Sequence, residues 1–198
     1  MRLLEFQAKR LFSEHGIPIP RNVLIESPTD LESLPYPVVL KAQVPVGGRG
    51  KAGAIKPVTD ANEAAAVLDE LLNISIRGNP VRAVLAEEKV EVQKELYLAL
   101  LIDKLAGLPV IIASDAGGVD IEQVDRESPE QIVKKYIDPS IGLSNYTVCY
   151  LAKRIGVEEH LCDFVKLAYS LFDIFQSYDG TLVEINPLAV TANGLLAL

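Results

Sequence analysis

Apolar residues that recur every three or four positions predict the helices of this chain. In the opening segment Leu4, Ala8 and Leu11 follow this spacing, so we expect an amphipathic helix that ends at Gly16. The helix expected at 128–136 rests on a cap and a first-turn proline in the sequence Ser-Pro-Glu-Gln. Similar periodicity and capping signals predict helices at 60–72, 146–155 and 159–175.

Short apolar runs bounded by turn residues predict the strands. The Asn-Gly pair at 193–194 adds a hairpin signal near the end of the chain. Because hairpins interrupt the alternation of helices and strands, the sequence favours mixed sheets with flanking helices over a doubly wound fold. The predicted strands cover residues 22–25, 38–44, 55–58, 81–86, 94–102, 110–114, 180–187 and 195–198.

Composition and charge narrow the classes of partner. The chain has 198 residues and a formal net charge of −8, which argues against a nucleic-acid partner. No apolar run reaches the ~20 residues that span a membrane, and the N-terminus has no signal-peptide pattern, so we expect no membrane partner and a cytoplasmic location. Cys149 and Cys162 lack the spacing of a metal site and are expected to be buried free thiols.

A glycine-rich segment at 47–53 is the first candidate for chemistry. Its glycines let backbone N–H groups approach an anion closely, and Lys41, Arg49 and Lys51 add positive charge. It is not a Walker A loop, because Ala52 stands where that motif needs a Ser or Thr for Mg²⁺. A hairpin tip that covers a polyphosphate and a solvated surface hairpin both fit this pattern.

Carboxylates and an amide provide the second set of candidates. On a strand, Glu184 and Asn186 point to the same face about 7 Å apart, at roughly 3.3 Å per residue, which suits a hard cation near a phosphate. An ordinary strand end is the alternative. Glu87 follows an apolar strand and Glu95 begins the next one, so this segment offers carboxylates and backbone groups to a base and a ribose.

Five segments, in order and at near-constant spacing, resemble the ATP-grasp portion of the succinyl-CoA synthetase β-subunit family. They are LLEFQAKRLFSEHGIPIP, LKAQVPVGGRGKAGAIK, LAEEKVEVQKELYLALLID, ASDAGGVDIEQV and GTLVEINPLAVT. The resemblance implies an α+β ATP-grasp fold in which two α+β lobes clasp a nucleotide. It makes residues 1–198 one ATP-grasp domain, with a smaller lobe at about 21–100 and a larger lobe formed by 1–20 and 101–198.

The resemblance also implies roles in nucleotide binding. Lys41 matches the lysine that holds the phosphates, and the loop that covers them matches Gly48, Arg49 and Gly50. Proline at position 20 is typical of members that use ATP rather than GTP. The segment after the phosphate loop contributes a hinge glutamate, a backbone contact and a carboxylate near the ribose, which correspond to Glu87, Val90 and Glu95.

Two further roles concern the metal and the reaction. Asn186 matches a Mg²⁺ ligand, and Glu184 matches the catalytic glutamate that meets a phosphohistidine carried by the partner α subunit. The implied enzyme is an ADP-forming acid-thiol ligase of the tricarboxylic acid cycle. It converts ATP, succinate and CoA into ADP, phosphate and succinyl-CoA through that phosphohistidine, with CoA bound by the α subunit.

Departures from the family pattern leave the acyl substrate open. Pro45 and Val46 replace the usual His-Ala before the glycines, and Ala54 replaces a glycine after them, which stiffens the loop. Ala116 replaces a glutamate that is common in succinate-specific members. A malate-CoA ligase, an ADP-forming acetyl-CoA synthetase, an ATP-grasp enzyme that joins a carboxylate to an amine, and a non-catalytic nucleotide-binding or assembly module remain alternatives.

Family members continue beyond the position of Leu198. They add an aspartate, which is the second Mg²⁺ ligand, and then a flavodoxin-like CoA-ligase domain. We therefore expect this chain to be a truncated part of its parent enzyme, to bind Mg-ATP weakly and to be inactive alone.

Overall fold

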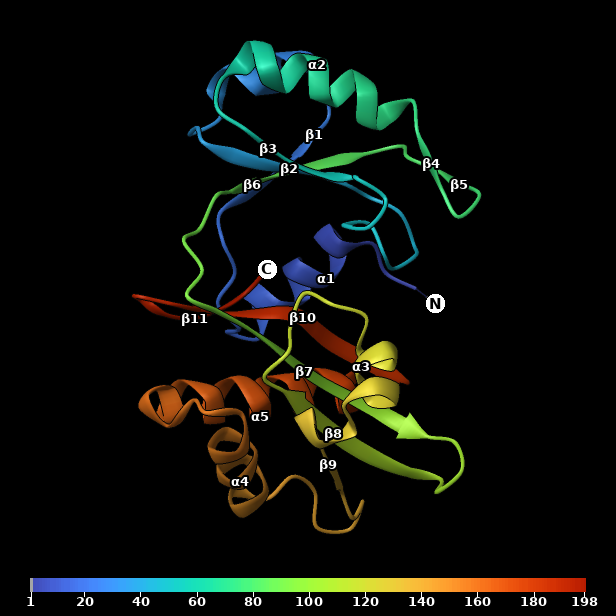
Figure 1. Cartoon of the computed structure of the whole chain (residues 1–198), viewed down its shortest axis with the longest axis vertical. Helices are drawn as coiled ribbons and strands as arrows, with labels where there is room; N and C mark the ends of the chain where they lie inside the picture. Colours follow the sequence, from blue (N-terminus) through green and yellow to red (C-terminus); the bar gives the residue numbers. More distant parts are fainter. Residues whose placement is uncertain (1) are drawn as a thin grey trace. The chain divides into compact units, whose positions relative to one another are not determined.

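The computed structural model describes residues 2–198, which form two compact units (Figure 1). Unit 1 contains the described residues up to Arg10 together with Pro20–Val90, and unit 2 contains Leu11–Ile19 and Glu91–Leu198. These boundaries differ from the expected lobes, because residues up to Arg10 group with the smaller unit and residues 91–100 with the larger one. The opening helix α1, Glu5–Glu14, therefore contributes residues to both units.

Unit 1 is an antiparallel sheet covered on one face by helical elements (Figure 1). Alternate strand residues such as Leu40 and Ala86 form its core with Leu31, Leu68 and Leu71 from those elements. The strands lie in the order β1 (Asn22–Ile25), β6 (Val84–Glu88), β2 (Val38–Ala42) and β3 (Ile55–Val58). The other elements are the 3₁₀ helix η1 (Pro28–Ser33), α2 (Ala61–Leu72), β4 (Ser75–Ile76) and β5 (Asn79–Pro80).

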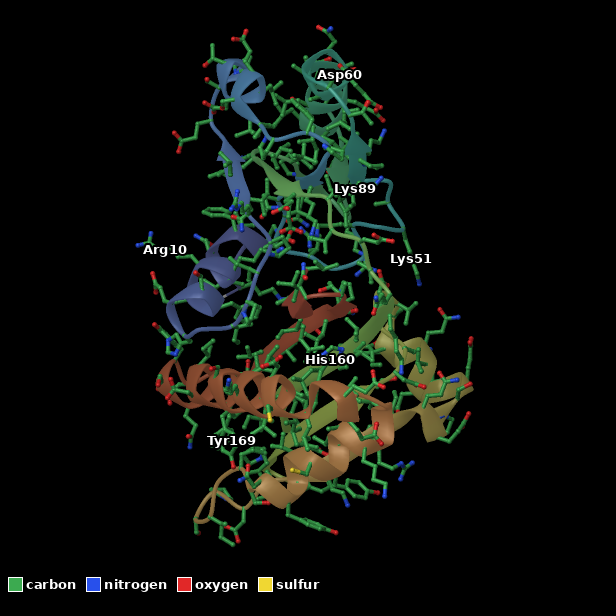
Figure 2. All side chains as sticks on the ribbon, turned by 90° about the vertical axis from the view of Figure 1, so that its left-hand side faces the viewer. Arg10, Lys51, Asp60, Lys89, His160 and Tyr169 are labelled. Carbon is green, nitrogen blue, oxygen red and sulfur yellow. The ribbon has the colours of Figure 1, made fainter. Side chains whose placement is uncertain are left out.

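Helix α2 begins where the sequence predicts, and its cap is built slightly differently. The Asp60 carboxylate, at the start of the helix in Figure 2, accepts hydrogen bonds from the backbone N–H groups of Asn62 and Glu63. The Glu63 carboxylate accepts from the backbone N–H and the hydroxyl of Thr59, one residue before the position that a capping box uses. Asp60 therefore satisfies two N–H groups of the first turn, and Glu63 fixes the residue before the cap.

Unit 2 is an antiparallel sheet whose core is completed by two long helices. Phe164, Leu167 and Leu171 on α5 pack with Leu98 and Leu100 on β7. The strands lie in the order β11 (Gly194–Ala197), β10 (Leu182–Thr191), β7 (Lys94–Asp103), β8 (Leu108–Ser114) and β9 (Ile132–Tyr136). The helical elements are α3 (Ile121–Glu127), the 3₁₀ helices η2 (Pro129–Gln131) and η3 (Glu158–His160), α4 (Asn145–Ile155) and α5 (Leu161–Ser177).

Some predictions of secondary structure are wrong. The expected helix at 128–136 is a 3₁₀ turn followed by strand β9, because hydrogen bonding of 132–136 to β8 outweighs the capping signals before it. Helix α3 and the β4–β5 hairpin were not predicted, and every strand pair in residues 2–198 is antiparallel, so the sheets are not mixed. Cys149 and Cys162 are exposed, since each lies beside the buried stripe of its helix. Within the described residues no helix is long and apolar enough to cross a membrane.

The turn after β8 lies directly on the backbone of β7. The N–H of Gly117 donates to the carbonyl of Glu95 at 3.0 Å, and a Cβ atom at position 117 would collide with the backbone of Leu96. Glycine is therefore required here by the close approach of two backbone segments.

We expect Gly117→Ala to lower the free energy of unfolding by about 2 kcal/mol, because the added methyl group forces two backbone segments apart. Urea unfolding followed by circular dichroism measures this change. Gly47→Ala is the control, since a Cβ atom at Gly47 meets open space and this glycine has no positive φ. Equal unfolding midpoints for the two variants would show that the close approach is unimportant.

Candidate functional site

A cluster of buried charges lies on the face of the unit 1 sheet opposite α2. Glu87 on β6 is directly opposite Val39 on β2, so its side chain shares a face with that of Lys41, two residues along. The other face carries Leu40 and Ala86, which pack in the core. Alternation along two adjacent strands thus places Glu87 and Lys41 on the face opposite the apolar core.

Helix α1 completes this cluster from the start of the chain. The carboxylate of Glu87, which is only 2% exposed, forms ion pairs with both Lys9 and Lys41. One oxygen of Glu5 lies 3.4 Å from Lys41 Nζ and 3.6 Å from Lys9 Nζ, and its other oxygen pairs with Arg49. Three cations against two carboxylates leave a net charge of +1, which suits an anionic ligand.

Burial and neighbouring charges shift the pKa of Glu5 in opposite directions. Burial alone would raise the pKa of this carboxyl group, but the charges of Lys41, Arg49 and Lys9 together lower the pKa from 4.5 to about 2. The pKa of Lys9 is lowered by burial and by Lys41, against the opposing effect of Glu87 and Glu5. The carboxylate of Glu5 is therefore ionised throughout the neutral range and holds the cations in place.

The glycine-rich segment forms the connection between β2 and β3, as the sequence predicts. It is folded on itself: the N–H of Ala52 donates to Gly48 O at 3.1 Å and the N–H of Ala54 donates to Arg49 O at 3.0 Å. The guanidinium of Arg49 turns back toward Glu5, while Lys51 is exposed on the loop (Figure 2). The loop therefore contributes Arg49 to the charge cluster and leaves its glycines at the surface.

Two other predicted residues, Glu95 and Asn186, both contact the Gly117–Gly118 turn within unit 2. The side-chain oxygen of Asn186 accepts a hydrogen bond from the N–H of Gly118 at 2.8 Å, and its amide nitrogen donates to Val119 O at 3.1 Å. Gly118 has a φ of 68°, and a Cβ atom there would collide with the carboxylate of Glu95. The Gly117–Gly118 turn thus brings Glu95 and Asn186 to the same place.

Glu184 lies on the same strand face as Asn186, as predicted, because buried Ile185 separates two exposed residues. Its carboxylate accepts a hydrogen bond from the Tyr97 hydroxyl at 3.1 Å. Burial, and then the charge of Glu184, raise the pKa of Tyr97. The phenol therefore stays protonated and orients the carboxylate.

Within residues 2–198 no group of three or more His, Cys, Asp or Glu side chains is placed to hold a metal. Asn186 fits the role of a single oxygen ligand, because its side-chain amide is oriented by two hydrogen bonds and Oδ1, which accepts one of them, has a second lone pair. Mg²⁺ commonly completes its coordination with phosphate oxygens and water. Pro20 and Val90 supply no polar side chain, so their contacts with a base stay predictions.

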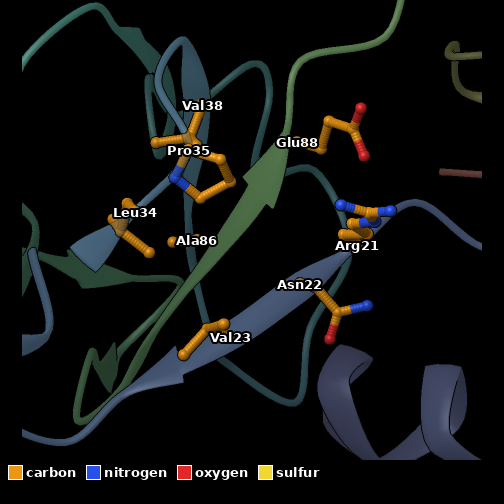
Figure 3. A pocket seen from close by; sticks show the side chains of 8 residues that line it. All are labelled: Arg21, Asn22, Val23, Leu34, Pro35, Val38, Ala86 and Glu88. Atoms are coloured by element: carbon orange, nitrogen blue, oxygen red, sulfur yellow. The ribbon is translucent and has the colours of Figure 1, made fainter.

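A shallow cavity of about 150 Å³ lies on the other face of the unit 1 sheet (Figure 3). Val23, Val38 and Ala86 form its apolar floor, and Arg21 and Glu88 lie at its rim. Because Val38 and Ala86 point away from the face that carries Glu87, this cavity is separate from the charge cluster.

Acid should remove the contribution of Glu5 to stability. Its pKa is below the unfolded value, so the stabilisation is complete above pH 4.5 and is lost as the pH falls toward 2. At neutral pH we expect Glu5→Gln to lower the free energy of unfolding by roughly 3 kcal/mol, at about 1.4 kcal/mol per pKa unit.

Urea unfolding of the wild type and of Glu5→Gln at pH 7, 4 and 3 measures this effect. The gap between the two proteins should narrow as the pH falls below 4.5, with the exposed-site variant Glu32→Gln as control. A gap that is independent of pH would contradict the charge cluster as the source of the stabilisation.

Known proteins resemble this chain in sequence and in fold. The β subunit of ADP-forming succinate–CoA ligase from Ignicoccus hospitalis is 45% identical over the whole chain, and that of Methanocaldococcus jannaschii is 40% identical over 98% of it. The chain spans about half the length of these curated relatives, 54% in each case.

Solved structures agree on the fold. The PH1788 protein from Pyrococcus horikoshii matches with a TM-score of 0.80 at 16% identity, covering 99% of this chain and 88% of that one. The ACD1 protein of Candidatus Korarchaeum cryptofilum, in complex with coenzyme A, matches with a TM-score of 0.77 at 20% identity, covering 100% and 90%. A family model described as an ATP-grasp domain matches residues 2–190. The expected α+β fold is confirmed, and the chain belongs to the ATP-grasp family.

Proposed function

We propose that this chain is the nucleotide-binding part of an ATP-dependent succinate–CoA ligase. The reaction of the whole enzyme converts ATP, succinate and CoA into ADP, phosphate and succinyl-CoA through a phosphohistidine on a partner α subunit. The observation that carries the proposal is the 45% identity, over the whole chain, to the β subunit of such an enzyme. The ionised cluster of unit 1 supports nucleotide binding as the contribution of this part.

Unit 1 supplies the cations for the phosphates in this proposal. Lys41 is held between Glu5 and Glu87, so its ammonium group is fixed before a ligand arrives. A fixed cation in a buried site interacts with a phosphate more strongly than a mobile, solvated one. The N–H groups of the Gly48–Gly50 loop would cover the phosphates, and Glu87, Val90 and Pro20 of the same unit would contact the base.

Unit 2 supplies the metal ligand and the catalytic carboxylate. Asn186 would hold Mg²⁺, which neutralises charge on the transferred phosphoryl group when bound. Glu184 would accept a hydrogen bond from the imidazole of the phosphohistidine. Tyr97 positions Glu184 for this contact, because its hydroxyl donates to the carboxylate at 3.1 Å.

A related acyl-CoA ligase is the second candidate. The structural relatives include an acetyl-coenzyme A synthetase and an ATP citrate lyase, which at 20% identity show the fold alone. Ala116, which stands where the succinate-specific pattern has a glutamate, favours a different acid such as malate or acetate. Comparing succinate, malate and acetate as substrates of the assembled enzyme, with its α subunit, would decide between them.

Nucleotide binding by the chain is directly measurable. We expect titration calorimetry to detect Mg-ATP at millimolar concentration, and Lys41→Gln to weaken binding at least tenfold, because a charged hydrogen bond contributes about 1.5–3 kcal/mol. Lys56→Gln on β3 is the matched control and should bind like the wild type. Absence of heat from the wild-type chain would favour the assembly-module alternative.

Metal dependence tests the role of Asn186. We expect Asn186→Ala to weaken Mg-ATP binding severalfold and to leave the binding of ATP in EDTA unchanged, because only the metal contact is lost. Asn186→Asp retains an oxygen ligand and should keep the response to Mg²⁺. Since Asn186 also holds the Gly118 turn, thermal unfolding of both variants is measured alongside. An equal loss of binding with and without Mg²⁺ would refute the metal role.

A further inference from the structure

The turn of the β4–β5 hairpin presents an arginine to the glycine-rich loop. Ile76 pairs with Asn79, so Arg77 and Gly78 form a two-residue turn. The guanidinium of Arg77 packs on the Cα of Gly48: a Cβ atom built on this glycine would lie 3.2 Å from Arg77 Nη2 and 3.7 Å from Cζ. Both segments belong to unit 1, although their contact was not apparent from the sequence.

The backbone of this turn is unfavourable for arginine. Arg77 has a φ of 49° and Gly78 a φ of 80°, as a type I′ turn requires. Asn or Gly normally occupies the first of these positions, because a side chain with a Cβ atom rarely adopts positive φ. Because the turn itself does not favour arginine, its presence at position 77 points to a role outside the turn.

The three cations of the charge cluster already have carboxylate partners. Lys9 and Lys41 pair with Glu87, and Arg49 pairs with Glu5. The guanidinium of Arg77 is exposed and has no hydrogen bond or ion pair with any of residues 2–198. It is therefore a cation beside the loop that can accept an anionic ligand without first losing a carboxylate.

We propose that Arg77 binds a phosphate oxygen of the nucleotide and thereby fixes the glycine-rich loop over the polyphosphate. This inference rests on the proposed nucleotide-binding function and adds a residue to it. A guanidinium donates several N–H groups in a planar arrangement that matches phosphate oxygens. With Arg77 the loop gains a cation from outside its own sequence, whereas the pairing of Arg49 with Glu5 keeps that side chain inside the cluster.

Arg77→Asn separates ligand binding from folding. Asn-Gly is the preferred pair for a type I′ turn, so the variant should unfold at the same temperature as the wild type or higher. Its Kd for Mg-ATP should nevertheless rise about tenfold, since a charge-assisted hydrogen bond is lost. The affinity for AMP should not change, because AMP lacks the outer phosphates.

Titration calorimetry on the 198-residue chain measures these affinities, and thermal unfolding measures stability. Arg77→Lys should retain part of the affinity, because it keeps the charge and loses the planar donor group. Arg82→Asn, an exposed arginine in the segment that leads into β6, is the matched control and should bind Mg-ATP like the wild type.

The outcomes distinguish this inference from the proposed function. If the wild type binds Mg-ATP and Arg77→Asn binds it equally well, the role of Arg77 is refuted while nucleotide binding stands. If Arg77→Asn loses affinity for AMP and Mg-ATP to the same extent, the arginine supports the loop only structurally, and phosphate recognition is likewise refuted. If the wild type itself binds no Mg-ATP, both proposals fail together.

Discussion

The buried carboxylate of Glu87 is the constraint on which unit 1 depends. An ionised carboxylate loses its hydration when it is buried, so it needs cations and hydrogen bonds in return. Lys41 comes from the neighbouring strand, but Lys9 comes from α1, 78 residues away in the chain. This requirement, with the hydrogen bond from Phe6 N–H to the Gln43 side chain, attaches the start of α1 to the sheet.

Pairing within the cluster prepares the site for a ligand. Removing one partner of a buried ion pair costs about 3–5 kcal/mol, so Glu5 and Glu87 hold the cations firmly in the absence of nucleotide. Their charges remain one short of neutralising the cations. In the proposed function, a polyphosphate with Mg²⁺ would be attracted by the remaining positive charge and would meet ammonium groups that need no further ordering. Because folding already orders these ammonium groups, ligand binding would lose less side-chain entropy.

Sequence patterns predict strand residues for the candidate site, but they do not reveal that helix α1 contributes to its charge cluster. Alternation predicts that Glu184 and Asn186 share a face, and the family resemblance predicts that Lys41 is a phosphate ligand. Glu5 and Lys9 look like an ordinary i,i+4 pair on a helix, because nothing near them in the chain reveals that they face Glu87. Tyr97 on strand β7 and Arg77 in the β4–β5 turn were missed for the same reason, since Glu184 and Gly48, which they contact, lie far from them in the sequence.

The prediction of a helix at 128–136 is wrong for a similar reason, because pairing with a strand distant in the sequence decides the structure. Its cap and first-turn proline are strong local signals, but they produce only the 3₁₀ turn Pro129–Gln131. Val133 then enters the core of unit 2 as β9 pairs with β8. Local signals decide how a segment begins, and the hydrogen bonds offered by an open sheet edge decide what it becomes.

In unit 2 the side chain of Asn186, the proposed metal ligand, is held by hydrogen bonds to the turn at Gly118 and Val119. Asn186 Oδ1 accepts from the N–H of Gly118, and its amide group donates to Val119 O, so the oxygen can turn only if the glycine turn moves with it. Gly118 in turn leaves room for the Glu95 carboxylate. A cation that binds Oδ1 polarises the amide and strengthens the bond it donates to Val119. Metal binding at Asn186 should therefore tighten the turn between β8 and α3, and through it the position of Glu95.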